Sequence, residues 1–362
     1  MPINRRELLR ASLIAGTGAV GCSFPSAAAS MTYKEAARAV RVPLQSSPRD
    51  RELVRFATLA ANSHNSQPWK FIAADTKIII APDFERKCPA VDPDDHHLFT
   101  SLGCAAENLV LAAAALGLKA TTRVEDDIIL IDLEAAPAVE SAQFAAIPAR
   151  QCTRAKYDGR SVAVADLALL EKACAEPGVS AIFITDKTKI ANVIDYVVQG
   201  NSAQMRDKAF MEELMSWMRF SEVDAVAAMD GLFSRSSGNP ALPAWIARPL
   251  LRFFFTENGE NEKYREQIES SAGIVVLTAD SADKAHWVAV GRACQRFGLQ
   301  ATALGLKYAF INQPVEVPAV RAQFASHLGI GQRRPDIVMR FGAGPDLPKS
   351  LRRPAKQVMT TP

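Results

Sequence analysis

The stretch Ser63-His64-Asn65-Ser66-Gln67-Pro68-Trp69-Lys70-Phe71 fits neither a helical nor a strand pattern. Before it, apolar residues at helical spacing predict a helix over residues 52–60. After it, residues 70–74 and 77–81 predict a β-hairpin. Ser63, Asn65 and Gln67 therefore lie in a polar turn between a helix and a strand, where they offer short hydrogen-bonding groups to a polar ligand edge. The alternative is a capped helix end followed by a buried tryptophan.

Two long predicted helices, over residues 98–116 and 288–304, share a spacing of glycines. In each, a glycine near the start lies fourteen residues before the glycine that ends the helix: Gly103 and Gly117, and Gly291 and Gly305. A shorter helix and a strand precede each long helix. This repeat predicts two similar halves, residues 31–146 and 147–362.

The second half carries extra sequence. About a hundred residues separate its strand from its long helix, against about thirty in the first half. We therefore expect an insertion over residues 186–270. Insertions of this length are often lids over a site, and the alternative is a helical decoration without a role in the site. We expect Trp217 and Trp245 to pack inside it.

Two stretches that each contain a pair of arginines form a second candidate site, for a phosphate group. In Arg150-Gln151-Cys152-Thr153-Arg154, two guanidiniums are spaced to clamp a phosphate through charge-assisted hydrogen bonds. Cys152 adds only a weak donor. A basic stretch near the end contains Arg352 and Arg353. The alternative for both stretches is a solvated basic surface.

The polar turn and the arginine string resemble motifs of the nitroreductase family, Ser-x-Asn-x-Gln-Pro-Trp-x-Phe and Arg-x-Ser/Thr-x-Arg. Members of that family also close with a basic stretch. Here the turn lies in the first half and the arginines in the second, which is similar to the Acg-type FMN-binding proteins. The resemblance implies an α+β, nitroreductase-like fold with two fused halves, each a small, mostly antiparallel sheet flanked by helices, plus a helical lid. It implies FMN contacts from Ser63, Asn65, Gln67, Arg150, Cys152, Arg154, Lys307, Tyr308, Arg352 and Arg353.

The same resemblance implies an FMN-dependent oxidoreductase that reduces nitro, quinone or similar acceptors. Its partners would be a small-molecule electron acceptor and an electron donor, either NAD(P)H or another reductant. The fused halves would mimic the usual homodimer within one chain. The alternative is a non-catalytic FMN-binding protein for flavin storage or sequestration, since a lid could exclude nicotinamide.

The first thirty residues have the pattern of a twin-arginine signal peptide. Arg5-Arg6 precedes the apolar stretch over residues 11–20, and Ala27-Ala28-Ala29 resembles a signal-peptidase site. We therefore expect a periplasmic protein that meets the twin-arginine export machinery. A lipid anchor at Cys22 is a less favoured alternative.

Other classes of function have little support. A net charge of +3 over 362 residues gives no reason to expect a nucleic-acid partner. His96 and His97 lie beside Asp92, Asp94 and Asp95, but adjacent side chains rarely converge on one ion, so we interpret this segment as a helix start. The sequence has neither a glycine-rich dinucleotide fingerprint nor a G-x-S-x-G elbow.

Overall fold

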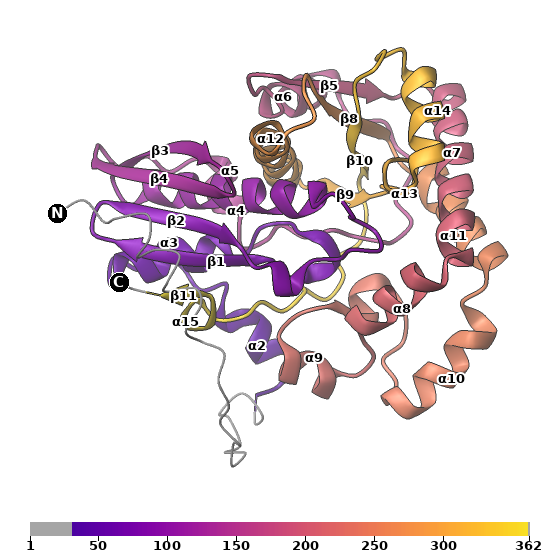
Figure 1. Cartoon of the computed structure of the whole chain (residues 1–362), viewed down its shortest axis with the longest axis horizontal. Coiled ribbons are helices and arrows are strands. Elements are labelled where there is room, and N and C mark those ends of the chain that lie inside the picture. Colours follow the sequence, from indigo (N-terminus) through magenta and orange to yellow (C-terminus); the bar gives the residue numbers. More distant parts are fainter. Residues whose placement is uncertain (1–30, 361–362) are drawn as a thin grey trace.

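The structure, a computed structural model, describes residues 31–360. The predicted signal over residues 1–30 lies outside the described residues. Within the described part, helices flank two larger β-sheets and a small two-stranded sheet (Figure 1). The predicted α+β fold class is confirmed.

The first sheet has five strands in the order β11-β1-β2-β4-β3. Their bounds are β1 (Trp69–Ala74), β2 (Lys77–Pro82), β3 (Leu118–Glu125), β4 (Ile128–Ala135) and β11 (Met359–Thr360). β1 and β2 form the predicted antiparallel hairpin, and β3 forms a second hairpin with β4. We did not predict β3, whose residues are alternately half-buried and exposed and lack a continuous apolar run. β11 pairs in parallel with β1, so the end of the chain returns to the first half.

The second sheet has four antiparallel strands in the order β5-β8-β10-β9. Their bounds are β5 (Val179–Ile184), β8 (Gly273–Ala279), β9 (Lys307–Phe310) and β10 (Pro335–Gly342). β8 and β10 are buried along their whole length. Alternate residues of β8 enter two separate apolar clusters, since Val275 packs on one side of the sheet and Val276 on the other. The sheet is therefore covered by helices on both faces.

Two twenty-residue helices, α4 (His96–Ala115) and α12 (Lys284–Ala303), pack against each other in the middle of the molecule (Figure 1). A Cβ atom added to Gly103 would lie 2.1 Å from the carbonyl oxygen of Val288. One added to Gly291 would lie 2.0 Å from that of Thr100. The first glycines of the repeat therefore permit a backbone-to-backbone crossing that no larger residue allows. α4 is long and apolar enough to span a membrane, but it is mostly buried and serves as a core helix.

Shorter helices surround this core. Their bounds are α2 (Tyr33–Ala39), α3 (Arg49–Ala57), α5 (Ala142–Ala146), α6 (Val164–Ala173), α13 (Gln313–Glu316), α14 (Pro318–Leu328) and α15 (Ala355–Val358), with single 3-10 turns η2 (Ser63–Asn65) and η3 (Phe84–Arg86). α3 and α6 match predicted helices. α2 was not predicted, although Thr32 and Glu35 form a capping box at its start.

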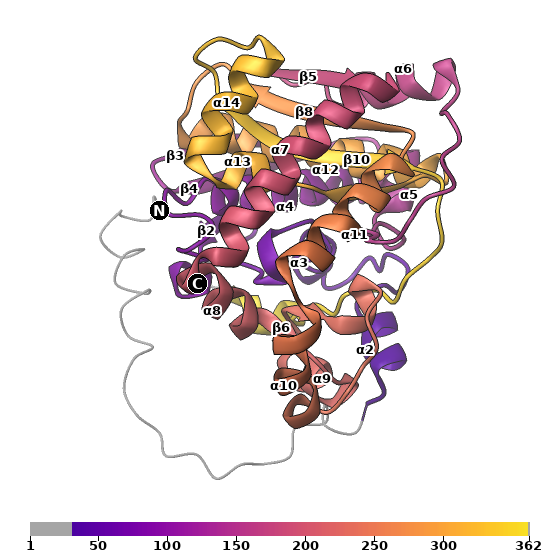
Figure 2. The same ribbon diagram turned by 90° about the vertical axis from the view of Figure 1, so that its right-hand side faces the viewer.

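The expected insertion is largely helical. It contains α7 (Lys187–Arg206), α8 (Lys208–Trp217), β6 (Met218–Arg219), α9 (Glu222–Ala228), β7 (Leu232–Phe233), η4 (Ser234–Ser237), α10 (Ala244–Phe254) and α11 (Glu257–Glu269). α7 and α11 run side by side, and they pack against the second sheet through residues such as Val193, Val197 and Ile268 (Figure 2). These two helices therefore belong to the core. Only residues 207–256, hereafter the cap segment, stand apart from both larger sheets (Figure 2).

One expectation about the insertion is wrong. Trp245 does not pack inside it, because 77% of the residue is exposed. Trp217 is half-buried, and the guanidinium of Arg86 lies over its ring at 5.4 Å. Arg86 comes from the loop after β2, so Trp217 packs the cap segment against the first half.

Candidate functional site

The predicted polar turn has an unusual backbone. His64, Asn65 and Gln67 have φ angles of 48°, 54° and 55°, in the left-handed region that non-glycine residues rarely adopt. Each such residue costs roughly 1–3 kcal/mol and persists only where its surroundings hold it. Here the side-chain oxygen of Asn62 accepts a hydrogen bond from the Gln67 backbone N–H at 2.8 Å. The turn is therefore a fixed irregular structure.

Two side chains of the turn tie it to distant parts of the chain. The Asn65 amide donates to the carbonyl oxygens of Gly231 (3.0 Å) and Leu351 (3.1 Å). Gln67 is fully buried; its amide donates to the Met229 carbonyl at 2.9 Å, and its oxygen accepts from the Arg353 backbone N–H at 2.8 Å. The turn thus connects the first half with both the cap segment and the C-terminal tail.

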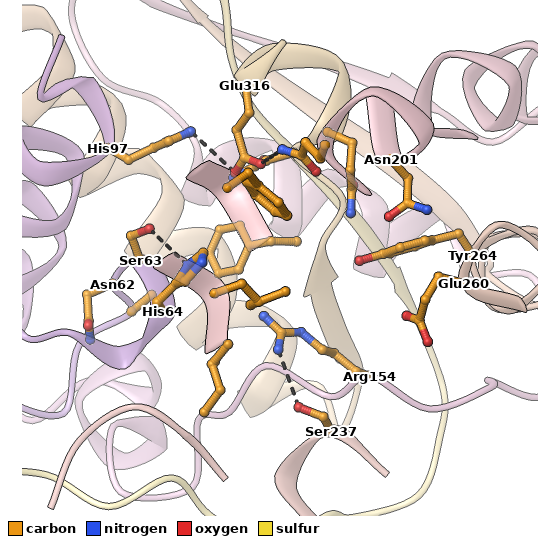
Figure 3. Close-up of a pocket in the computed structure, with 18 of the residues that line it drawn as sticks. Asn62, Ser63, His64, His97, Arg154, Asn201, Ser237, Glu260, Tyr264 and Glu316 are labelled. Carbon is orange, nitrogen blue, oxygen red and sulfur yellow. Dashed lines mark hydrogen bonds and ion pairs between the residues drawn. The ribbon is translucent and has the colours of Figure 1, made fainter. Parts of the chain in front are cut away.

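A cavity of about 210 Å³ lies beside the turn. Figure 3 shows side chains from both halves and from the insertion converging on it. Its walls include Ser63 and His64 from the turn, His97 from α4, Arg154 and Glu316 from the second half, and Tyr264 from α11. Phe210 and Leu214 of α8 add apolar wall from the cap segment. The walls combine apolar surface with a few polar groups, which is typical of a small-molecule site.

A second cavity, of about 70 Å³, adjoins the first. The two share lining residues that include Asn62, His64, Arg154 and Phe310. Four guanidiniums line the second cavity: Arg41, Arg150, Arg154 and Arg352. The two cavities are therefore neighbours, and the smaller one is the cationic end of the pair.

These arginines are held by neutral groups. Arg150 donates to the Tyr308 hydroxyl (2.7 Å) and the Leu59 carbonyl (2.9 Å). The Arg352 side chain donates to the Thr58 and Ala60 carbonyls at 2.8 and 3.1 Å. Within residues 31–360, none of the four guanidiniums lies within 4.0 Å of a carboxylate oxygen. Their charges are therefore not neutralised by the protein.

Burial and the close approach of these guanidiniums to one another lower the pKa of two of them. Burial and the charge of Arg150 lower the pKa of Arg41 to about 10. Burial, then Arg150 and Arg41, lower the pKa of Arg352 as well. The Nε atoms of Arg41 and Arg150 are buried without hydrogen-bond partners. A bound phosphate would neutralise the cluster and accept these free hydrogen bonds.

The structure brings six of the ten predicted site residues to the two cavities: Ser63, Asn65, Arg150, Cys152, Arg154 and Arg352. The other four lie elsewhere. Gln67 and Tyr308 are buried behind the site, where Tyr308 supports Arg150. Lys307 pairs with Asp346 at 2.5 Å, and Arg353 donates to the Gln67 carbonyl at 2.5 Å. Neither lines the two cavities described above, since the Lys307 ammonium lies against Asp346 and the Arg353 guanidinium against the Gln67 carbonyl.

Arg41 also lines the smaller cavity and is not among the predicted site residues; it lies two residues after the end of α2. Its guanidinium donates to the carbonyls of Ala37 and Ser350, both at 2.8 Å. Arg38 and Arg41 are three positions apart in the sequence. No local sequence pattern indicates that Arg41 lies beside Ser350, which is 309 positions further along the chain. Glu316 and Tyr264, at the larger cavity, were not predicted either.

The four guanidiniums of the smaller cavity lead to a prediction that can be tested without flavin. Inorganic phosphate should raise the melting temperature of the ligand-free protein, with about 2.7 kcal/mol of stabilisation at a hundred times its dissociation constant. Arg41→Gln should reduce this effect, because it removes one of the four charges. Differential scanning fluorimetry against chloride at matched ionic strength measures both. Equal shifts with phosphate and chloride would contradict a phosphate site.

Comparison with known proteins gives sequence relatives over most of the chain. Two proteins of Mycobacterium tuberculosis, from strains CDC 1551 / Oshkosh and H37Rv, are each named "Putative NAD(P)H nitroreductase". Each is 25% identical to this chain over 328 residues, which cover 86% of this chain and 91% of the relative. No protein-family model matches the sequence.

Solved nitroreductases match part of the structure. The FMN-dependent nitroreductase NfnB from Mycobacterium smegmatis, in complex with NADPH, matches 56% of this chain and 87% of its own, at 13% identity and a TM-score of 0.38. A nitroreductase with bound FMN from Desulfitobacterium hafniense matches 61% of this chain and 98% of its own, at 13% identity and a TM-score of 0.38. Over most of its length, the chain is therefore similar in sequence to two mycobacterial proteins named as nitroreductases.

Proposed function

We propose that this protein is an FMN-dependent oxidoreductase of the nitroreductase type, which reduces nitro, quinone or similar acceptors. One observation carries the proposal: in the described chain, four guanidiniums without carboxylate partners line a small cavity that the polar turn also lines, and this cavity adjoins the larger one. Such a space suits a flat polar ring with a terminal phosphate. The sequence relatives named as NAD(P)H nitroreductases support the same reaction class.

The residues fit FMN in different roles. Arg41, Arg150, Arg154 and Arg352 would hold the phosphate. Asn65 acts indirectly, since its oxygen accepts from Arg352 at 2.6 Å and its nitrogen donates to two backbone carbonyls. The flavin, when bound, supplies the electron-transfer chemistry, and the protein binds it, orients it and shields it from water.

We further propose that the fused halves build one FMN site per chain. The turn comes from the first half and Arg150 and Arg154 from the second, and they meet at the same pair of cavities. The reciprocal contacts of Gly103 and Gly291 give the crossing of α4 and α12 an approximate two-fold character. Export by the twin-arginine route to the periplasm also remains our proposal, and it would suit a protein that carries its cofactor already bound.

One observation favours the second candidate, a non-catalytic FMN-binding protein. The cap segment is fastened to the first half: Asp230 pairs with Arg86, and Glu213 accepts from the Ala90 backbone N–H at 2.8 Å. Arg219 holds the other Asp230 oxygen at 2.6 Å. A cap held this way would restrict the access of nicotinamide to the larger cavity.

Anaerobic titration of the FMN-loaded protein with NADPH separates the two candidates. An oxidoreductase predicts that the flavin absorption bleaches and returns when 1,4-benzoquinone is added. A storage or sequestration protein predicts bands that persist with NADPH and NADH and bleach only with dithionite. Asp230→Asn, which loosens the cap segment, should then speed bleaching if access is the barrier.

A further inference from the structure

A carboxyl group of unusual environment lines the larger cavity on the side away from the arginine cluster. Glu316 ends α13, and its Oε2 accepts a hydrogen bond from the Gln204 amide at 2.6 Å. Its Oε1 lies 3.6 Å from Nε2 of His97 on α4. Figure 3 shows Glu316 and His97 directed toward one another at the cavity wall, opposite Arg154 and Ser237.

Charges from several elements set the state of this carboxyl. The pKa of Glu316 is raised to about 7, chiefly by burial and also by the charges of Asp92 and Glu213, while the Gln204 hydrogen bond and Arg154 act in the opposite direction. His97 faces it as a neutral ring, because burial lowers the pKa of His97 to about 3. A carboxyl in this setting carries its proton near neutral pH, which a surface glutamate does not.

The other titratable groups on the cavity are less suited to supply a proton. Burial lowers the pKa of His64 to about 4 and raises that of Tyr264 to about 12, so neither changes its charge near neutral pH. The thiol of Cys294 is buried, with a pKa well above its usual value. Glu260 pairs with Lys263 at 3.6 Å. Efficient proton donors have a pKa close to the working pH, and Glu316 meets this condition.

We propose, resting on the function proposed above, that Glu316 is the acid that protonates the acceptor. A quinone becomes a quinol by gaining two electrons and two protons, and a bound reduced flavin would supply the electrons together with one proton. The second proton comes from Glu316: its O–H bond breaks, a quinol O–H bond forms, and the carboxylate regains a proton from solvent. His97 Nε2 has no hydrogen-bond partner within the described chain, so it is free to accept one from the protonated carboxyl or from the quinol.

The variant Glu316→Gln tests this assignment. Glutamine keeps the size of the side chain and an oxygen that can accept from the Gln204 amide, but it has no carboxyl proton to donate. In anaerobic stopped-flow, reoxidation of the reduced protein by 1,4-benzoquinone should slow about 100-fold. The wild-type rate should fall as pH rises above about 7, because the acid form is lost, and the variant should lack this dependence. Glu260→Gln makes the same chemical change elsewhere on the cavity and should keep the wild-type pH profile.

Infrared titration gives a second readout that needs no flavin. The flavin-free wild type should lose a protonated-carboxyl band near neutral pH, and Glu316→Gln should lack that component. A Glu316 that titrates near pH 4, or a variant that keeps the wild-type rate and pH profile, overturns the proposal. Failure of NADPH to reduce the bound flavin counts instead against the oxidoreductase function, because that step precedes any use of Glu316.

Discussion

Arg154→Ala is expected to weaken FMN binding about 100-fold, since hydrogen bonds to charged groups contribute about 1.5–3 kcal/mol each. Arg154 lines both cavities, and among the described residues its guanidinium makes one weak hydrogen bond, to the Ser237 hydroxyl at 3.4 Å. Its charge is therefore available to the phosphate. Because so few contacts are lost, the melting temperature of the ligand-free variant should stay close to that of the wild type. Quenching of FMN fluorescence measures the dissociation constant.

Lys156→Ala is the matched control for this prediction. Lys156 lies two residues further along the same basic string, but it is exposed and pairs with Glu266 at 2.8 Å. Its removal should change FMN affinity less than three-fold, as expected for an exposed pair whose worth is about 1 kcal/mol or less. Equal losses in the two variants would mean that general positive charge, and not the cavity, binds the cofactor.

Gly291→Ala is expected to destabilise the protein by about 3 kcal/mol or more. The new methyl group would meet the Thr100 carbonyl oxygen at 2.0 Å, and this atom belongs to the backbone of α4 and cannot rotate away. The two long helices would have to separate, which would disturb the apolar core shared by both halves. Thermal unfolding of the flavin-free protein should show a melting temperature lower by roughly 4 °C or more.

Gly305→Ala serves as the comparison. Gly305 has a φ of 72° but no atom within 4 Å of an added Cβ. Its replacement should therefore cost only the backbone strain, about 1–2 kcal/mol. If the two variants are equally stable, the close crossing at Gly291 does not determine the packing of the helices.

Periodicity and glycine spacing in the sequence were enough to predict the parts of the fold with strong local signals. α12 and the β1–β2 hairpin combine clear apolar patterns with definite ends. β3 and α2 were missed for different reasons. β3 lies at the edge of its sheet and buries little apolar surface, while α2 begins with a capping box that the sequence contains and that we overlooked.

The residues of the candidate site could be predicted from the sequence only where they belong to a short, continuous motif. Ser63, Asn65, Arg150 and Arg154 belong to short strings, and the structure brings all of them to the cavities. Arg41 lies at the site because of the way α2 packs in the folded chain, and no short sequence motif predicts that packing. Lys307 was placed by position along the chain, but its side chain points toward Asp346, because residues alternate in direction along β9.

The division of the insertion into core helices and the cap segment could not be predicted from length alone. The number of residues between the strand and the long helix predicted an insertion over the whole of residues 186–270. α7 and α11 nevertheless cover one face of the second sheet. An amphipathic helix that covers a sheet and one that covers a ligand have the same pattern in sequence, since both bury one apolar stripe.

The most direct test of this account is an FMN titration of the purified protein, with the mass of the complex measured by sedimentation. The account predicts saturation at one FMN per chain in a monomer, because the turn of the first half and the arginines of the second complete one site. The absence of FMN binding, or saturation at one FMN per two chains, would contradict it.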